Sequence, residues 1–395
     1  MTSSRHDQPV IATYDAADLP ARRDELLERR QPAVISGLFK GQLLGELTDA
    51  QKVREALGDL QVMIGVNYID AHLANIRNFV QGSSAPIAID KKPGLLRDYL
   101  DLIEREPTTR ALTSEQPTPE RILNDCNLGA VGIEKVHGGY GNPLAQRSAS
   151  EAHSLMFVAN AGNASDLHTD WDGRDVLLHQ VFGRKRIVLF PPKSGFKLFP
   201  IDIFSTVAVN AMDDAERAAL IAYAGGVEVV VEAGETILMP AFWWHHVGYV
   251  DAAMSVSFRF GGVTDPDAVA LIGSVHRDCH IQNIVAGTLD PRRAEASKAA
   301  ARRLRAAAAE PAPSAREKYR AMRILAAECY RSTLLPGEQA PAEPVITAED
   351  FLDGALCAFY RRPPKGPAWR QRIWQKREAF NEAVRRFGRR LAYQA

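Results

Sequence analysis

The 395-residue sequence is poor in cysteine and has no excess of either charge. Lys and Arg together number 48, as do Asp and Glu, so no net field of the whole molecule attracts nucleic acid or anionic lipid. The cysteines lack CxxC spacing, which argues against a disulfide framework and against a structural zinc site. There are four of them, Cys126, Cys279, Cys329 and Cys357. This pattern fits a reducing compartment, and we expect a cytoplasmic protein.

Long apolar runs are also missing. No stretch of the sequence reaches the roughly 18 to 20 apolar residues that a membrane-spanning helix needs. The polar N-terminus, Met1 to Gln8, contains no apolar leader segment. We therefore expect no membrane association. With 46% apolar residues the chain can still bury a large core, in one large domain or two smaller ones.

Hydrophobic periodicity divides the chain into three regions. Residues 1–123 mix helical spacing with short strand-like runs, and we expect them to support the core. Between about Leu155 and Gly262 the period changes to two, with short runs separated by Gly or Pro, which is typical of a jelly roll or double-stranded β-helix. We place this catalytic core at residues 124–263. Residues 264–395 return to helical spacing. The sequence thus predicts an α+β fold with a mainly β catalytic core between helical regions.

Two details of the β region bear on the site. The segment Phe182 to Lys185 separates two strand-like runs, and we interpret it as a tight hairpin turn. On the last predicted strand, residues 253–260, alternation places Ser255, Ser257 and Arg259 on one face and three apolar residues on the other. A cation can therefore face the centre of the jelly roll.

His168-Thr169-Asp170 stands at the start of the β region. On an extended strand, residues i and i+2 point to the same face, so the imidazole and the carboxylate can converge on one metal ion. A second H-x-D motif, His276 to Asp278, lies in a helical pattern, where i and i+2 point to nearly opposite sides. We therefore reject the second motif. His276 and His280, at i and i+4, can in principle bind zinc, but a solvated helix face is the preferred interpretation.

A candidate third ligand follows downstream. The segment Gly234 to Val247 contains a tight turn, a strand that ends at Pro240, and then His245 and His246 beside bulky aromatic residues. A jelly roll can bring such a segment beside the H-x-D strand. Two histidines and one aspartate make the facial triad of non-haem Fe(II) proteins, which leaves positions open for a bidentate 2-oxo acid and for O2.

The stretch 163–262 closely resembles the JmjC or cupin-like oxygenases that depend on Fe(II) and 2-oxoglutarate, above all the asparaginyl hydroxylase that acts on hypoxia-inducible factor. The matching motifs are Gly162-Asn163, His168-x-Asp170, Gly183-Arg184-Lys185-Arg186, Leu189-Phe190-Pro191-Pro192 and Trp243-Trp244-His245-His246. The resemblance covers about a quarter of the chain closely. It implies a double-stranded β-helix that uses Fe(II), 2-oxoglutarate and O2.

Carried over by position, the resemblance makes His168, Asp170 and His245 the iron ligands, and it leaves His246 as a neighbour. Lys185 matches the lysine that pairs with the distal carboxylate of 2-oxoglutarate. Ser165 matches a hydroxyl that supports the same group. A lysine ammonium in a narrow β pocket is a strong carboxylate anchor.

The sequence departs from the family in three places near this site. The family tyrosine that contacts the co-substrate would fall near Ala111-Leu112-Thr113, where there is no tyrosine. The last strand reads Ser257-Phe258-Arg259 where the relatives have Asn-Phe-Trp, and two residues are added after the H-x-D motif. We expect Arg259, Ser257, Trp171 and Asp172 to contact the substrate, with Arg259 binding an acidic group. The alternative is that Arg259, rather than Lys185, anchors 2-oxoglutarate.

The segment 361–395 carries eleven Lys or Arg against two Glu, a net charge of 11 − 2 = +9. Such a segment can bind RNA or an acidic protein, but a docked helix with a solvated outer face is the preferred interpretation. Apolar residues from Trp369 to Leu391 recur at helical spacing, and C-terminal helices form the dimer interface in the family. We therefore expect a homodimer.

Together these observations predict a dioxygenase that hydroxylates an unactivated C–H bond, with a protein or peptide side chain as the preferred substrate. A hydroxylase or demethylase of tRNA or of a small molecule stays open. A non-oxidative metal-binding cupin is the rival from another class.

Overall fold

The computed structural model describes residues 11–340, apart from 66–89, 110, 143–147, 171, 199, 202, 206, 208, 273–278 and 314. The strands are β1 (Ala12–Asp15), β2 (Ala33–Ser36), β3 (Gln61–Gly65), β4 (Lys91–Leu95), β5 (Thr113–Pro117), β6 (Lys135–Gly138), β7 (Glu151–Ala159), β8 (Asp175–Phe182), β9 (Lys185–Phe190), β10 (Pro200–Ile201), β11 (Phe204–Ser205), β12 (Val227–Val231), β13 (Glu235–Met239), β14 (Trp244–Tyr249) and β15 (Ala253–Phe260). The α-helices are α1 (Leu19–Glu28), α2 (Leu43–Glu46), α3 (Ala50–Leu57), α5 (Leu96–Arg105), α6 (Glu120–Leu123), α7 (Asp214–Ala224), α8 (Pro266–Ile272), α9 (Cys279–Gly287), α10 (Ala294–Ala309) and α11 (Ala315–Arg331).

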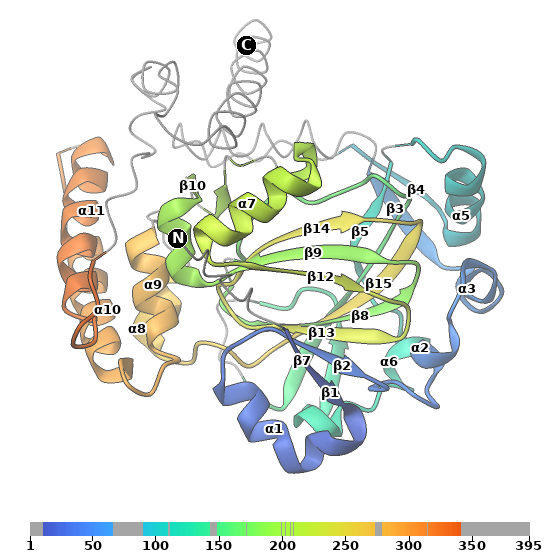
Figure 1. Cartoon of the computed structure of the whole chain (residues 1–395), viewed down its shortest axis with the longest axis horizontal. Coiled ribbons are helices and arrows are strands. Elements are labelled where there is room, and N and C mark those ends of the chain that lie inside the picture. Colours follow the sequence, from blue (N-terminus) through green and yellow to red (C-terminus); the bar gives the residue numbers. More distant parts are fainter. Residues whose placement is uncertain are drawn as a thin grey trace, which may run out of the picture.

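Two facing sheets form the core of the fold (Figure 1). The larger sheet has the order β1-β2-β13-β8-β15-β7-β5, with β6 paired to β7, and the smaller sheet has the order β12-β9-β14. Leu178 of β8 and Ile237 of β13 share one apolar cluster with Ile187 and Leu189 of β9, so the two sheets pack face to face. This is the double-stranded β-helix that the sequence predicts, and the fold class is confirmed.

Helices cover the outer faces of both sheets. Val256 and Phe258, on the outer face of β15, pack in one cluster with residues of α1, α3 and α5. On the smaller sheet, Phe190 and Trp244 pack against Leu220 of α7. The alternation predicted for β15 is therefore confirmed, because its apolar residues face the helices while Ser257 and Arg259 line the space between the sheets.

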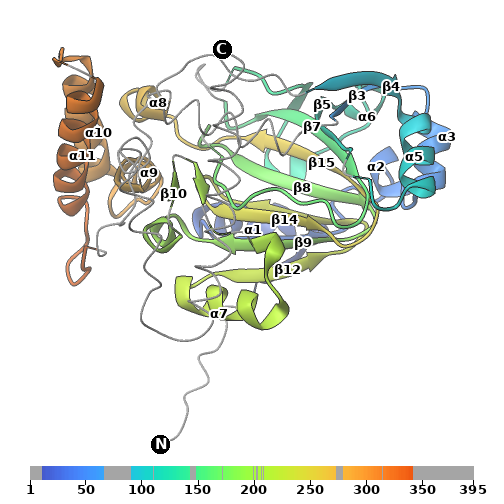
Figure 2. The same ribbon diagram turned by 90° about the horizontal axis from the view of Figure 1, so that it is seen from above.

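Strands from the N-terminal region belong to the larger sheet. β2 pairs with β13 in antiparallel register, and β5 pairs with β7. The sheet thus crosses the boundary expected at residue 123. Helices α2, α3 and α5 lie at one end of the β core and helices α8 to α11 at the other (Figure 2).

The predicted hairpin at Phe182 to Lys185 is wrong. β8 pairs with β13 and β15, whereas β9 pairs with β12 and β14, so the two strands belong to different sheets. The turn carries the chain from one sheet to the other. Gly183 has a φ of +66°, and a Cβ placed there would lie 2.1 Å from the Ala252 carbonyl oxygen. A side chain at this position would therefore be strained as well as crowded.

Some predictions fall outside the described residues. These are the rejected motif at His276, the loop residue Trp171, and the C-terminal segment on which the dimer prediction depends. Within the part of the chain that the structure describes, no helix is long and apolar enough to cross a membrane.

Candidate metal centre

The backbone brings the two candidate histidine ligands together. His168 and His245 form an isolated antiparallel bridge, in which the His168 N–H donates to the His245 carbonyl at 3.0 Å and the His245 N–H donates to the His168 carbonyl at 2.7 Å. Their ring centroids consequently lie 4.3 Å apart. Asp170, two residues after His168, approaches the Nε2 of His245 with its Oδ2 at 4.0 Å.

The Nδ1 atom of each imidazole orients the ring by a contact with a backbone carbonyl. The Nδ1 of His168 lies 2.7 Å from the Asp166 carbonyl, and the Nδ1 of His245 lies 3.0 Å from the Trp243 carbonyl. An Nδ1–H that donates to a carbonyl leaves the Nε2 lone pair available for a metal. Burial lowers the pKa of His168 to about 4, so this ring is neutral at physiological pH, as a ligand must be.

These three side chains form one group with metal-ligand geometry. Among the described residues, one ligand atom each of His168, Asp170 and His245 lies within 4.8 Å of the other two. His246 is buried but does not belong to this group. The structure therefore brings together the three ligands that the sequence predicts, and it excludes His246 from them.

Arg259 faces the cavity as predicted, but its ion-pair partners were not predicted. Its Nη1 lies 2.9 Å from the Oδ2 of Asp170 and 3.3 Å from the Oδ2 of Asp172. Burial by itself raises the pKa of the Asp170 carboxyl, but the Arg259 guanidinium and the two nearby histidines outweigh this effect and hold the pKa well below its usual range. Asp170 is therefore ionised, and Arg259 is its cationic partner.

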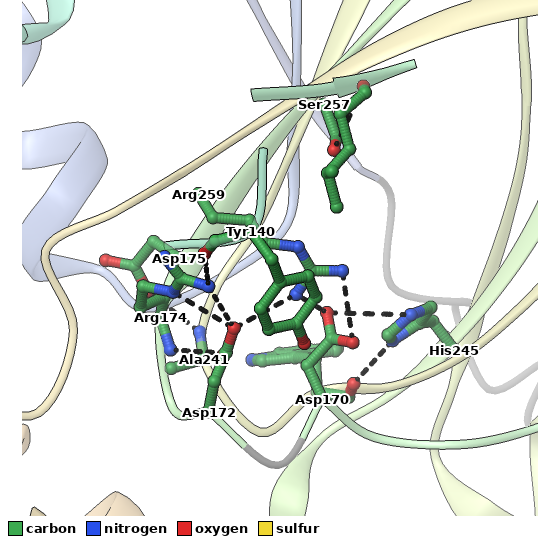
Figure 3. A network of polar contacts seen from close by, with 11 residues as sticks. Tyr140, Asp170, Asp172, Arg174, Asp175, Ala241, His245, Ser257 and Arg259 are labelled. Carbon is green, nitrogen blue, oxygen red and sulfur yellow. Dashed lines mark hydrogen bonds and ion pairs between the residues drawn. The ribbon is translucent and has the colours of Figure 1, made fainter. Parts of the chain in front are cut away.

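Asp172 belongs to the same ion network (Figure 3). Its carboxylate is fully buried and accepts hydrogen bonds from the Nε and the Nη2 of Arg174 at 3.0 and 2.8 Å. The guanidinium groups of Arg174 and Arg259 both lie about 5 Å from the centre of the Tyr140 ring, at 5.2 and 5.1 Å. Asp172 was expected to contact the substrate, but it does not line the cavity beside the candidate metal ligands.

A cavity of about 140 Å³ opens beside the candidate ligands. Lys185 and the three candidate ligands belong to its wall. The remaining wall residues are Leu112, Glu115, Phe157, Ala164, Ser165, Val176, Leu178, Met239, Val247, Tyr249, Ser257 and Arg259. The predicted residues Ser165 and Ser257 thus both face the cavity, and the Ser165 hydroxyl accepts a hydrogen bond from the Val247 N–H at 3.0 Å.

Lys185 is a buried ammonium without a carboxylate partner among the described residues. Its Nζ donates to the Ser255 hydroxyl at 2.5 Å and lies 4.2 Å from the centre of the Tyr249 ring. Burial lowers the pKa of Lys185 to about 7, because a charged amine loses its hydration there. An anion bound in the cavity would compensate this charge.

Three wall or network residues were missed at the level of the sequence. Tyr249 lies two residues beyond Val247 and four beyond His245 on β14, so the period-two pattern could have identified it. Tyr140 lies outside any described helix or strand, where no such pattern exists. Glu115 has a φ of +55°, which is uncommon for a residue other than glycine, and only the folded backbone reveals this strain.

A double-stranded β-helix that holds two histidines and one carboxylate beside a cavity defines a cupin-type metal-binding protein. The chain belongs to the family described as the cupin-like domain, whose sequence model matches residues 20–263.

The sequence similarity to three known proteins extends over much of this domain. Jumonji C domain-containing protein 5 of Drosophila melanogaster is 27% identical over 263 residues, which cover 63% of this chain and 59% of that protein. Lysine-specific demethylase 8 of Xenopus tropicalis is 29% identical, over 64% of this chain and 53% of that protein. tRNA wybutosine-synthesizing protein 5 of Gallus gallus is 35% identical, over 62% of this chain and 75% of that protein.

The predicted family is thus confirmed at its broad level. The matched region spans little more than half of the length of the first two relatives, at 59% and 53%. None of the three relatives is named as an asparaginyl hydroxylase, so the resemblance to that particular enzyme is not carried by these matches.

Proposed function

We propose that this protein is an Fe(II)- and 2-oxoglutarate-dependent dioxygenase that hydroxylates an unactivated C–H bond. One atom of O2 enters the product hydroxyl and the other enters succinate, while the 2-oxo acid loses CO2. When bound, the iron, the co-substrate and O2 supply this oxidising chemistry together. The protein supplies ligands, an anchor and a substrate pose.

The observation that carries this proposal is the Lys185 ammonium, which faces the same cavity as the candidate metal ligands and has no carboxylate partner in the described part of the chain. A non-oxidative cupin needs a metal site but has no need for a buried cation that faces its cavity. Burial lowers the pKa of Lys185 to about 7, so the ammonium bears a desolvation cost that a bound carboxylate would relieve.

The donor set also fits Fe(II). Two imidazoles and one carboxylate on one side of an ion form the facial arrangement that non-haem Fe(II) oxygenases use. Lys185 contacts Ser255, and Arg259 contacts Asp170. Since Ser255 and Arg259 are four residues apart on β15, Lys185 and Asp170 approach the cavity at different points along this strand. A small dicarboxylic acid can lie between them.

Apolar side chains form part of the cavity wall. Val176, Leu178, Met239 and Val247 place apolar side chains around the candidate ligands. Apolar surroundings lower the local dielectric constant, which strengthens the electrostatic contact between Lys185 and a carboxylate.

We propose a protein or peptide side chain as the substrate. Glu115 lines the cavity with an exposed carboxylate on a strained backbone, and this group suits a cationic side chain such as that of lysine or arginine. Two relatives carry names that support a protein or a tRNA substrate, a lysine-specific demethylase and a tRNA wybutosine-synthesizing protein. Hydroxylation of tRNA is therefore the second candidate.

Anaerobic addition of Fe(II) and then 2-oxoglutarate tests the reaction class without knowledge of the substrate. A weak visible charge-transfer band should form in the wild-type protein and should be lost in Asp170→Ala. Admission of O2 should then yield succinate. A protein that binds Fe(II) but shows neither the band nor succinate is a non-oxidative cupin.

A further inference from the structure

The ion network behind the candidate metal centre contains two arginines and two carboxylates. Arg259 and Arg174 carry the positive charges, and Asp170 and Asp172 the negative charges. Asp170 is also a candidate metal ligand. Asp170 therefore has two cationic partners when a metal ion is bound, the ion and Arg259.

The guanidinium of Arg259 contacts both Asp170 and Asp172. Its Nη1 donates to the Oδ2 of Asp170 at 2.9 Å, and its Nη2 donates to the Oδ1 of Asp170 at 3.3 Å. The same Nη1 lies 3.3 Å from the Oδ2 of Asp172. The Nε of Arg259 is buried and has no hydrogen-bond partner among the described residues. Asp170 and Asp172 are thus the two carboxylates between which the guanidinium is shared, as Figure 3 shows.

Asp172 is held in place by contacts that do not involve Arg259. Besides the two bonds from the Arg174 side chain, its Oδ1 accepts a hydrogen bond from the Arg174 backbone N–H at 3.1 Å. The Arg174 Nη2 is held in turn by the Tyr140 carbonyl at 2.9 Å. The position of Asp172 therefore does not depend on Arg259.

We propose that Asp172 is a positioning residue, which draws the Arg259 guanidinium away from Asp170 when Asp170 binds a metal ion. Asp172 then sets the metal affinity without touching the metal. This inference rests on the metal centre of the proposed function. It goes beyond that function because it assigns opposite effects to the two partners: Asp172 favours metal binding, and Arg259 opposes it.

The test is Co(II) binding in the absence of 2-oxoglutarate, measured by calorimetry and by the visible absorption of the ion. Asp172→Asn keeps the size of the side chain but removes its charge, so Arg259 is left with Asp170 as its carboxylate. We expect Co(II) binding to weaken roughly 10- to 100-fold, the range found when a group that supports a metal ligand is lost. Arg259→Met should bind Co(II) at least as tightly as the wild type.

The double variant Asp172→Asn/Arg259→Met distinguishes the proposed exchange of Arg259 between Asp170 and Asp172 from structural damage caused by the substitutions. Removal of the competing cation should restore Co(II) affinity to within a few-fold of the wild type, although two native contacts are lost. A double variant that binds no better than Asp172→Asn alone would overturn the proposal. If Asp172→Asn does not fold, Arg259→Met decides alone: a folded Arg259→Met protein with tenfold weaker binding shows that Arg259 supports Asp170, which is the opposite of the proposal.

Arg30→Met is the matched control. Arg30 forms a part-buried two-bond ion pair with Asp175, at 2.8 and 2.7 Å, and neither residue belongs to the metal-ligand group. Its loss should leave Co(II) affinity unchanged. Failure of the wild-type protein to bind Co(II), or binding that survives Asp170→Ala, would contradict the metal centre itself. Equal affinity in the wild type and all Asp172 and Arg259 variants would contradict only the exchange.

Discussion

His168 and His245 are joined through their backbones independently of a metal ion, because each N–H donates to the carbonyl of the other residue. The distance between their rings is thus fixed by strand pairing rather than by the flexible side chains. Preformed ligands of this kind bind an ion without the cost of ordering a loop.

Loss of any one ligand should therefore remove the activity. We expect His168→Ala, Asp170→Ala and His245→Ala each to abolish 2-oxoglutarate turnover, measured as succinate formed. His246→Ala is the matched control, since His246 is a buried neighbour outside the ligand group, and it should retain part of the turnover. Full turnover in Asp170→Ala would sink the assignment of the triad.

Lys185 should determine the affinity for the co-substrate. Lys185→Ala removes a buried charge-assisted contact worth about 1.5 to 3 kcal/mol, so the 2-oxoglutarate concentration at half-maximal turnover should rise roughly 10- to 100-fold. The adjacent Arg184 forms an exposed ion pair with Asp251, and Arg184→Ala should change this concentration little. An equal response of the two variants would remove Lys185 as the anchor.

The sequence was sufficient for features that depend on local alternation. The faces of β15 follow from a period of two, and the structure confirms them. The family resemblance, not alternation, placed Lys185 in the pocket, and Lys185 lines the cavity. The distant histidine of the H-x-D motif could be inferred from the residues around it. The strand expected at the motif is reduced to isolated bridges of His168 with Phe204 and His245, and His168 and Asp170 still converge. The family resemblance added the choice of His245 over His246.

Features that depend on pairing between distant segments could not be predicted. The turn at Gly183 resembles a hairpin locally, and only the pairing of β8 with β13 and of β9 with β12 shows that it joins two sheets. Arg259 was expected to bind an acidic group of the substrate or the co-substrate. Its observed partners depend on the burial of Asp172, which a loop sequence does not reveal.

Gly183, in the turn that carries the chain from one sheet to the other, should be more sensitive to substitution than another glycine with a similar positive φ. Gly225, which ends α7, has a φ of +72° and open space where a Cβ would lie, whereas a Cβ at Gly183 would lie 2.1 Å from a backbone oxygen. Gly225→Ala should cost about 1 to 2 kcal/mol of unfolding free energy from backbone strain alone. Gly183→Ala should cost about 1 to 3 kcal/mol more, from overpacking.

Urea titration of both glycine variants measures this difference. Equal midpoints for Gly183→Ala and Gly225→Ala would mean that the turn can relax, and that the close approach to Ala252 does not constrain the connection between the sheets.

Binding of 2-oxoglutarate should be coupled to protonation of Lys185, because burial lowers the pKa of this side chain to about 7. At pH 8 most of the free protein therefore carries a neutral amine at this position. A bound carboxylate favours the ammonium, so binding of 2-oxoglutarate should take up a proton, approaching one per site at pH 8. For the same reason the affinity should fall as the pH rises above about 7, by up to about tenfold per pH unit.

Calorimetry in buffers of different ionisation enthalpy counts these protons. The experiment uses anaerobic Fe(II) protein, and the observed enthalpy should change with the buffer in the direction of proton uptake. Lys185→Met should lose both the uptake and most of the affinity. Lys185→Arg keeps a permanent charge, so any binding that it retains should proceed without proton uptake. Uptake that persists in Lys185→Met would place the proton on another group and would contradict the anchor role of Lys185.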